Sequence, residues 1–287
     1  MRAINVNPPK FQRNQLKIYA YIVPICLFML LPIIYIFTSA FKPISELFQF
    51  PPRFFVENPT VDNFIRLEQT TQQASVSLGR YIFNSALVTF SVVLLTVIIA
   101  SMAGYAFSKL KLRGKNVLFE MNTVALMFVP VAVTIPRYLV IDGLGIVNTY
   151  FAHIMPLLAM PVGLFLLKQF IDQVPDELLE AARVDGAGTV RIYFQLIIPL
   201  VTPAIATVAI LAFQAVWGNI ETSTLFTTKE SMRTLAFYMN TLVAQNNSVA
   251  GQGMAAASML IMFVPNIVLF IILQSKVMNT MAHSGMK

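Results

Sequence analysis

Charged residues are scarce in this sequence. Asp, Glu, Lys and Arg together make up 11% of its 287 residues, whereas soluble domains average about 25%. Such a chain has too few charged side chains to cover the surface of an ordinary soluble domain, so that class is excluded. Hydrophobic residues reach 57% and the mean hydropathy is +0.71. The apolar residues also gather in long runs, which predicts a protein that crosses a membrane several times.

Cysteine and histidine are almost absent. The chain has one cysteine, Cys26, and two histidines, His153 and His283. A single cysteine cannot form an intramolecular disulfide, and the histidine spacing matches no metal-binding pattern. We therefore expect neither a disulfide framework nor a metal site.

Six apolar runs are long enough to cross a bilayer. A helix needs about 20 residues to span roughly 30 Å of hydrocarbon, and helices are the only solution for such runs in lipid. The runs cover residues 18–41, 81–108, 117–140, 143–167, 192–220 and 253–275. The first run has 24 uncharged residues, too many for a signal-peptide core of about 7–15, so we expect a retained anchor helix.

The cations are distributed unevenly between the links. Placing the N-terminus inside assigns 13 of the 20 Lys and Arg residues to the inner side and 7 to the outer side. The positive-inside rule then predicts that both termini are cytoplasmic. The net charge of +7 is spread over short links between lipid-embedded runs, so no basic face for nucleic acid is expected.

The expected fold is all-α, with six transmembrane helices in a prokaryotic plasma or inner membrane. We divide the chain into an N-terminal region, 1–79, a core of five transmembrane helices, 80–277, and a C-terminal tail, 278–287. The core contains a long inner link, 172–199, that a plain six-helix bundle would not require.

This inner link predicts two short helices joined by a turn. It reads QVPDELLEAARVDGAGTVRIYFQLIIP from residue 173 to residue 199. Pro175 suits a first helical turn, and Asp176 favours the positive end of the helix dipole. Gly186 is a good helix stop, and Thr189 is a candidate cap for a second helix. Leu178, Leu179 and Ala182 are predicted to share one apolar face. These features also fit an ordinary amphipathic connector.

The spacing within the link adds a resemblance. It resembles the EAA loop of binding-protein-dependent ABC importer permeases, whose pattern is EAA, three residues, G, nine residues and I-x-L-P. Glu180-Ala181-Ala182 is followed here by Gly186 and then by Leu196, Ile198 and Pro199. Leu and Ile replace the Ile and Leu of the pattern, and both departures keep an apolar side chain.

Other strings extend the resemblance over about residues 18–277. The chain is similar to the carbohydrate branch, with the six-span permease subunits of maltose type. The supporting strings are Gly104-Tyr-Ala-Phe-Ser-Lys109, Leu144-Gly-Ile-Val-Asn-Thr-Tyr150 and Trp217-Gly-Asn219. Family members more often carry Asn directly after the Trp, so a role for Asn219 does not carry over.

The resemblance implies a MetI-like permease subunit that forms half of a carbohydrate path and is driven by a separate ATPase. The implied partners are a second homologous permease subunit, two ATPase subunits and an extracytoplasmic solute-binding protein. The implied ATPase-docking residues are Glu180, Ala181, Ala182, Arg183, Asp185, Gly186, Arg191 and Pro199. ATP and Mg would bind in the ATPase, and no catalytic residue is expected in this chain.

The sequence itself agrees that nucleotide binds elsewhere. It contains no G-x-x-x-x-G-K-[ST] phosphate loop, since Gly114-Lys115 is followed by Asn116. Polar side chains within the runs are candidates for the translocation path, because they should face protein or water rather than lipid. They are Asn84, Asn122, Asn148, Gln214 and Asn266, and helix-to-helix hydrogen bonds are the alternative explanation for each.

Two other functions remain open at this point. One is an ABC permease for a different solute, such as a peptide, an amino acid or a polyamine. The other is a stand-alone secondary transporter, which would usually place ionisable residues near the middle of a span. No run has such a residue at its centre, which argues against the second alternative.

Overall fold

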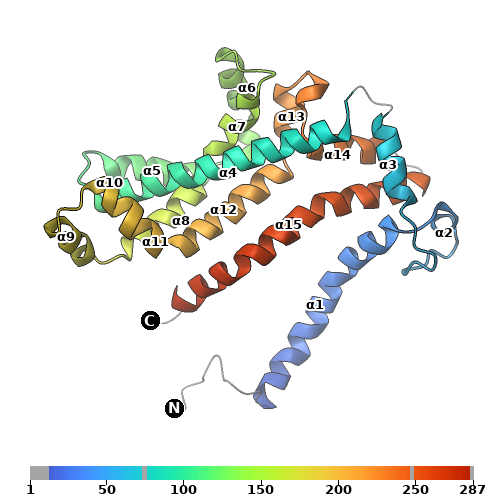
Figure 1. The fold of residues 1–287 in the computed structure, drawn as a ribbon, viewed down its shortest axis with the longest axis horizontal. Coiled ribbons are helices and arrows are strands. Elements are labelled where there is room, and N and C mark those ends of the chain that lie inside the picture. Colours follow the sequence, from blue (N-terminus) through green and yellow to red (C-terminus); the bar gives the residue numbers. More distant parts are fainter. Residues whose placement is uncertain (1–12, 73–75, 246–248, 285–287) are drawn as a thin grey trace. The chain divides into compact units, whose positions relative to one another are not determined.

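The computed structural model describes residues 13–72, 76–245 and 249–284. Within these ranges the chain forms helices and connecting segments, and no β-strand is present. Three helices are long and apolar enough to cross a membrane unbroken (Figure 1). They are α1 (Arg13–Ala40), α4 (Leu78–Lys109) and α15 (Val249–Ser284).

Three further spans are bent pairs of helices. α5 (Lys115–Ala125) is followed, after a break, by η1 (Pro130–Val133) and α6 (Thr134–Gly143) at 111°. α7 (Tyr150–Leu158) meets α8 (Pro161–Asp172) at 46°, and the helical stretch 189–200 meets α12 (Thr202–Trp217) at 80°. Counted as one span each, these pairs bring the described residues to six candidate spans, in agreement with the six runs of the sequence.

The chain divides into two compact units. Unit 1 comprises Met1–Leu67 and Gln245–Leu260, and unit 2 comprises Glu68–Ala244 and Ile261–Lys287. Within unit 1, Ala40 packs against Ala256 and Ala257, with Phe41, Phe64 and Leu260 around them. In the same unit the buried Asn63 amide donates to the carbonyls of Ala40 and Lys42, at 2.9 and 2.8 Å. Asn63 thereby satisfies carbonyls that the end of α1 leaves unpaired.

Unit 2 is built around α4. Its central residue Ala100 packs with Leu167 of α8 and with Ala204 and Val208 of α12. Gly104 lets α4 approach α8 closely, because a Cβ at this position would lie 3.2 Å from the backbone nitrogen of Lys168. The small residues therefore set the spacing of the helices that carry the inner link.

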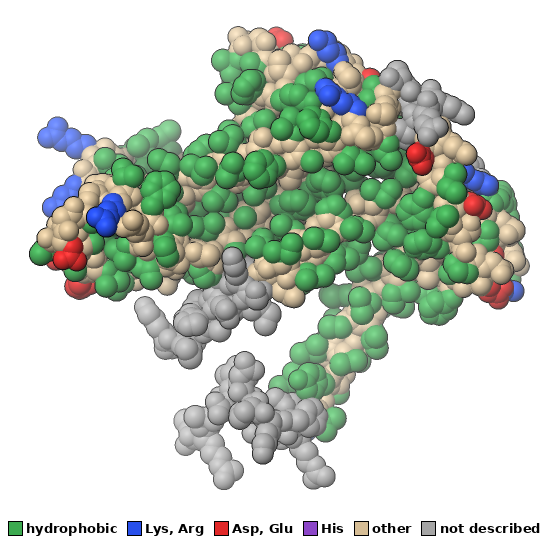
Figure 2. All heavy atoms as spheres, in the orientation of Figure 1, with side chains coloured by type: hydrophobic (Ala, Val, Ile, Leu, Met, Phe, Trp, Pro, Cys, Tyr) green, Lys and Arg blue, Asp and Glu red, His purple; other side chains and the backbone are tan. Residues whose placement is uncertain are grey.

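Apolar side chains cover much of the visible surface, as Figure 2 shows. The most apolar stretch of α1 buries none of its residues within the chain. A water-soluble protein rarely exposes an apolar surface of this extent, whereas a lipid-embedded helix requires one. Lys and Arg side chains gather at the end of unit 2 that carries α5, α9 (Asp176–Val184) and α10 (Thr189–Ile192) (Figures 1 and 2).

Candidate functional site

The inner link folds into two helices joined by a turn, as the sequence predicts; we call residues 172–199 the elbow. Its first helix, α9, starts directly after Pro175 and ends at Val184. Gly186 adopts φ +81°, and its backbone nitrogen donates to the Arg183 carbonyl at 3.0 Å. The next nitrogen, on Ala187, donates to the Ala182 carbonyl at 2.9 Å. Together these bonds form a Schellman motif, which ends the helix and requires the left-handed conformation at Gly186.

The elbow has an apolar underside. Leu179 of α9 is buried together with Val174, Ile192 and Ile197, and Ala182 packs against this cluster. Leu178, predicted on the same face, is instead exposed. The cluster fixes α9 through one side of the helix only, and the opposite side does not take part in it.

The outer side of the elbow is exposed in the part of the chain that the structure describes. The candidate docking residues that are exposed are Glu180, Ala181, Arg183, Asp185, Gly186, Arg191 and Pro199, while Ala182 is half-buried. Their exposure leaves small, acidic and basic groups available to a partner along α9 and at the two short helices that follow it.

A buried cation fixes the base of the elbow. The Lys109 ammonium, at the end of α4, donates to the Val174 carbonyl at 2.6 Å and to the Asp176 carboxylate at 2.8 Å. This hydrogen bond and the charge of Lys109 lower the pKa of the Asp176 carboxyl below its usual range. The first turn of α9 is therefore attached to α4 at neutral pH.

The second helix of the elbow differs from the prediction in its cap. Gly188 is the N-cap and Thr189 is already the first helical residue, so Thr189 does not cap α10. Residues Tyr193–Ile197 (η2) continue as a π-helix before α11 (Ile198–Leu200). The hydroxyls of Tyr193 and Ser101, on α4, are hydrogen-bonded at 2.7 Å. This bond and the buried apolar cluster attach η2 to α4, the same helix whose Lys109 holds the start of α9.

Two of the candidate path residues, Asn84 and Asn148, hold one loop. The loop lies between α13 (Glu221–Phe226) and α14 (Leu235–Gln245) and includes η3 (Glu230–Met232). The buried Asn84 amide donates to the carbonyls of Ser231 and Arg233, at 2.9 and 2.8 Å, and accepts from the Tyr150 hydroxyl at 2.8 Å. Asn148, at φ 62°, accepts from the backbone nitrogens of Thr228 and Lys229.

The other three candidate path residues lie on different helices. Asn122 donates to the Pro161 carbonyl at 3.2 Å and lines a small cavity of about 180 Å³ at the α7–α8 bend. Asn266 donates to the carbonyl of Met262 one turn earlier, at 3.0 Å. Gln214 is exposed on α12. The structure thus does not bring the five residues together into one site.

A larger cavity lies between the α5–α6 and α7–α8 spans. It has a volume of about 580 Å³ and is lined mainly by apolar residues, including Phe128, Pro130, Pro136 and Pro156. Arg137 is its one charged lining residue, and its guanidinium pairs with the Glu221 carboxylate at 3.0 Å. The cavity follows from the break between α5 and α6, the span whose prolines predict a kink.

Sequence reasoning missed the buried residues that complete the 226–235 loop. His153 is fully buried; its Nδ1 lies 2.9 Å from the Thr222 hydroxyl and its Nε2 lies 3.1 Å from the Met232 carbonyl. The Ser85 hydroxyl accepts from the Leu235 nitrogen at 2.8 Å. The position of His153 within an apolar run was the one feature of the sequence that could have indicated a buried, hydrogen-bonded side chain. Among the described residues, no group of His, Cys, Asp and Glu could hold a metal ion.

Comparison with known proteins decides the family. Residues 7–276 match the family model described as the binding-protein-dependent transport system inner membrane component. The chain belongs to this family. As an inner-membrane component it is a transport subunit rather than an enzyme, and it works in a system that depends on a binding protein.

Relatives of this transport subunit match most of its length. The sulfoquinovosyl glycerol transport system permease protein SmoH of Agrobacterium fabrum is 26% identical, over 90% of this chain and 89% of the relative. The arabinooligosaccharides transport system permease protein AraQ of Halalkalibacterium halodurans is 28% identical, over 94% of each chain. The trehalose/maltose transport system permease protein MalG of Thermococcus litoralis is also 28% identical, over 79% of this chain and 81% of the relative.

A solved structure shares the fold. A chain of a bacterial ABC transporter involved in the import of the polysaccharide alginate matches with a TM-score of 0.78 and 20% identity. The match covers 93% of this chain and 99% of that one. The membrane component therefore has the MetI-like permease fold that the sequence resemblance implied.

Proposed function

We propose that this chain is a permease subunit of an ATP-driven carbohydrate importer and that a separate ATPase docks on its elbow. The observation that carries the proposal is the geometry of α9. Its apolar side is fixed on the transmembrane helices, and its other side presents Ala181 and Gly186 with charged neighbours. Small residues allow a second protein backbone to approach closely, and the surrounding charges supply directional contacts.

Transmission of force requires that the docked helix be rigidly attached to the spans. Lys109 attaches the start of α9 to α4, and Tyr193 attaches the exit of the elbow to the same helix through Ser101. A movement imposed on α9 would therefore move α4 and, through their shared core, α8 and α12. ATP and Mg bind in the ATPase in this proposal, and none of the residues of this chain is catalytic.

The proposed assembly contains this chain, a second homologous permease subunit, two ATPase subunits and a solute-binding protein on the outer face. The two permease subunits each form half of the path. The distribution of Lys and Arg supports cytoplasmic termini and an elbow on the same side, where ATP is available.

The proposed cargo is a sugar or an oligosaccharide. Three relatives that match most of the chain bear the names of carbohydrate transport systems. The 580 Å³ cavity suits an uncharged cargo, since the charge of its one cationic lining residue, Arg137, is balanced by Glu221. A peptide or a polyamine would place uncompensated charge beside this pair.

Uptake measurements test the proposal. Cells that lack this chain should lose ATP-dependent uptake of a carbohydrate, measured over a panel of labelled sugars, peptides, amino acids and polyamines. The exposed substitution Ala181→Trp should abolish restored uptake, whereas Leu112→Trp, exposed on the link between α4 and α5, should restore it. Loss of peptide or polyamine uptake alone would contradict the cargo, and normal uptake with Ala181→Trp would contradict docking.

A further inference from the structure

The segment between α1 and α3 (Asp62–Gln72) folds into a closed loop within unit 1; we call residues 42–58 the return segment. The residues on either side of it are joined by a hydrogen bond from the Thr60 nitrogen to the Phe41 carbonyl at 2.8 Å. The carboxylate of Glu46, on α2 (Ile44–Leu47), is 6% exposed and accepts from the nitrogens of Glu57 and Asn58, at 3.1 and 2.8 Å. A carboxylate that holds two backbone nitrogens gives the segment one defined conformation.

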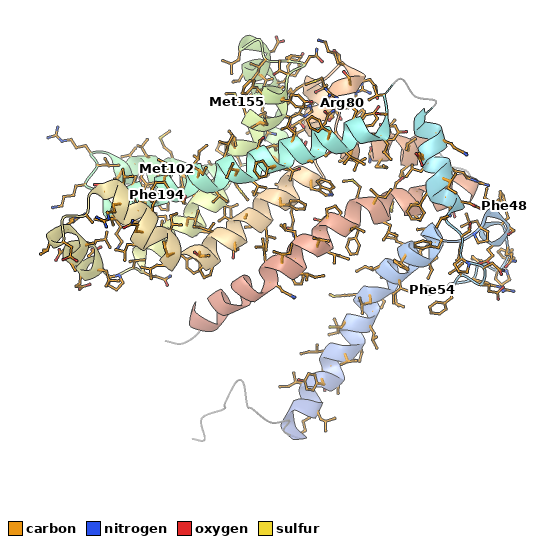
Figure 3. The ribbon with its side chains drawn as sticks, in the orientation of Figure 1. Phe48, Phe54, Arg80, Met102, Met155 and Phe194 are labelled. Carbon is orange, nitrogen blue, oxygen red and sulfur yellow. The ribbon has the colours of Figure 1, made fainter. Side chains whose placement is uncertain are left out.

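The return segment folds back along α1. The Lys42 ammonium, on a side chain that is 4% exposed, donates to the Arg53 carbonyl, and the Thr38 hydroxyl donates to the Phe54 carbonyl at 3.0 Å. The Phe54 ring, labelled in Figure 3, lies near α1, and its centre is 5.8 Å from that of the Tyr35 ring. Residues 53–55 therefore lie beside the last turns of α1 rather than beyond its end.

The length of α1 places these last turns at the edge of the hydrocarbon. The apolar part of α1, Leu16–Ala40, has 25 residues, which at 1.5 Å each is about 37 Å, compared with roughly 30 Å of hydrocarbon core. The helix is thus about 7 Å longer than the core. With Leu16 placed at the inner boundary, this excess lies at the outer end of the helix. The step from Tyr35 to Ala40 is also about 7 Å, so the outer boundary between acyl chains and headgroups falls near Tyr35 and the ring of Phe54.

The return segment exposes three aromatic rings and buries two of its charged side chains. Lys42 and Glu46 are buried, whereas Phe48, Phe50 and Phe55 are exposed; the exposed charges of Arg53 and Glu57 form an ion pair with each other. Phe55, which is 67% exposed, packs edge to face on Phe54 with ring centres 5.1 Å apart. Exposing aromatic rings while burying charges is unfavourable in water but matches the membrane interface, where aromatic residues are enriched.

We propose that the return segment is a lipid anchor, in which Phe54 and Phe55 join Tyr35 of α1 to form an aromatic belt at the acyl–headgroup boundary. Its ligand is the lipid interface, and its buried Lys42 and Glu46 hold the rings at a fixed depth. The anchor would set the vertical position of α1 and limit its tilt. This inference is independent of the cargo and of the ATPase.

Spin labelling of the full chain in lipid nanodiscs tests the depth. Cys26 is the one cysteine of the sequence, so Cys26→Ala gives a background for single labels at Phe55→Cys, Phe28→Cys and Val184→Cys. Phe28 lies in the middle of α1 and is 75% exposed, and Val184 lies on the elbow and is 87% exposed. The ratio of collisions with oxygen to collisions with a water-soluble nickel complex should be highest at Phe28, lowest at Val184 and intermediate at Phe55.

Two results would overturn the anchor. A ratio at Phe55 equal to that at Val184 would place the ring in water, and a label shielded from both reagents would show that protein covers it. Phe55→Trp provides a second, milder probe with lipids brominated near the headgroup. The fluorescence that this tryptophan adds should be quenched more strongly than the fluorescence of the buried Trp217, measured in the unmodified chain. Equal quenching would also reject the proposal.

Discussion

Gly186 and Gly188 lie two residues apart in the elbow but have different backbone conformations. Gly186 has φ +81°, whereas Gly188 has φ −71°, which any residue adopts. A Cβ at either position would meet no atom of the chain within 4 Å. Substitutions at the two glycines therefore differ in backbone strain, and neither introduces a steric clash.

Gly186→Val is expected to destabilise the end of α9 by about 1–2 kcal/mol, because a β-branched residue is strained in the left-handed region. Hydrogen exchange of the amides of Arg183 to Ala187 measures this loss as faster exchange. Gly186→Asn should cost less, since Asn tolerates this conformation, and Gly188→Val should leave the exchange rates unchanged. Equal effects of all three variants would show that the positive φ does not determine stability here.

At the scale of single residues, the sequence predicted the stop of α9 but not the cap of α10. A glycine after an amphipathic turn is a local signal, and the Schellman bonds that use it are local as well. Whether Gly188 or Thr189 serves as the N-cap depends on where the chain turns after Gly186, and both residue types are acceptable caps. That choice depends on how α10 packs through Ile192 into the buried cluster.

At the scale of elements, the first turn of α9 is held by one buried ammonium. Lys109→Met would leave the Val174 carbonyl without this donor and the Asp176 carboxylate without its partner. We expect a loss of about 1–3 kcal/mol in local stability, seen as faster hydrogen exchange through α9. Asp176→Asn keeps the bond to Val174 and should have the smaller effect; the reverse order would show that the surface ion pair is the principal attachment.

The pKa of Asp176 gives the pH range of this attachment. Lys109 lowers the pKa of the folded-state carboxyl, so its contribution is complete above the ordinary aspartate value of about 3.9 and is lost as the pH falls through the lower folded value. Between pH 6 and 8 the Asp176 carboxylate therefore stays ionised and paired with Lys109. The exchange rates of the α9 amides should change over this range only by the intrinsic pH dependence of exchange, which is measured in the Asp176→Asn variant.

The loop between α13 and α14 provides a second prediction for an element. Asn84→Leu would remove the amide donor from the Arg233 carbonyl and one of two donors from the Ser231 carbonyl, which also accepts from the Arg80 Nε at 3.1 Å. Each lost hydrogen bond costs about 0.5–1.5 kcal/mol, so protease digestion should cut the loop faster. Tyr150→Phe removes only the hydrogen bond from the Tyr150 hydroxyl to the Asn84 side-chain oxygen and should change the rate of cleavage less. An unchanged rate for Asn84→Leu would leave the amide free for a role in the path.

The presence of a proline in a span does not by itself determine whether the span is broken. Pro24 and Pro32 lie inside the continuous helix α1, and Pro265 lies inside α15. The spans that contain Pro130, Pro161 and Pro203 are bent at breaks near these residues. Both groups have prolines in apolar runs, and the difference depends on packing between distant helices, which supplies or withholds partners for the freed carbonyls.

At the scale of the whole molecule, long apolar runs and the charge of the links were sufficient to predict the class of protein and the number of candidate spans. The return segment was not predicted, because its order depends on a buried Lys42 and a buried Glu46 that pair with backbone groups 11 residues away. The candidate path residues also stay predictions: Asn84 and Asn148 hold a loop in this chain, and in the proposed assembly a second permease subunit provides the other half of the path.

Site-specific photo-crosslinking measures whether an ATPase contacts the elbow. A photo-reactive amino acid at the exposed Ala181, in cells that carry out the transport, should form a covalent product with an ATPase chain, identified by mass spectrometry. The same group at Phe28, on the exposed surface of α1, should give no such product. Transport-active cells that yield no ATPase product from Ala181, or equal amounts from both positions, would contradict the account.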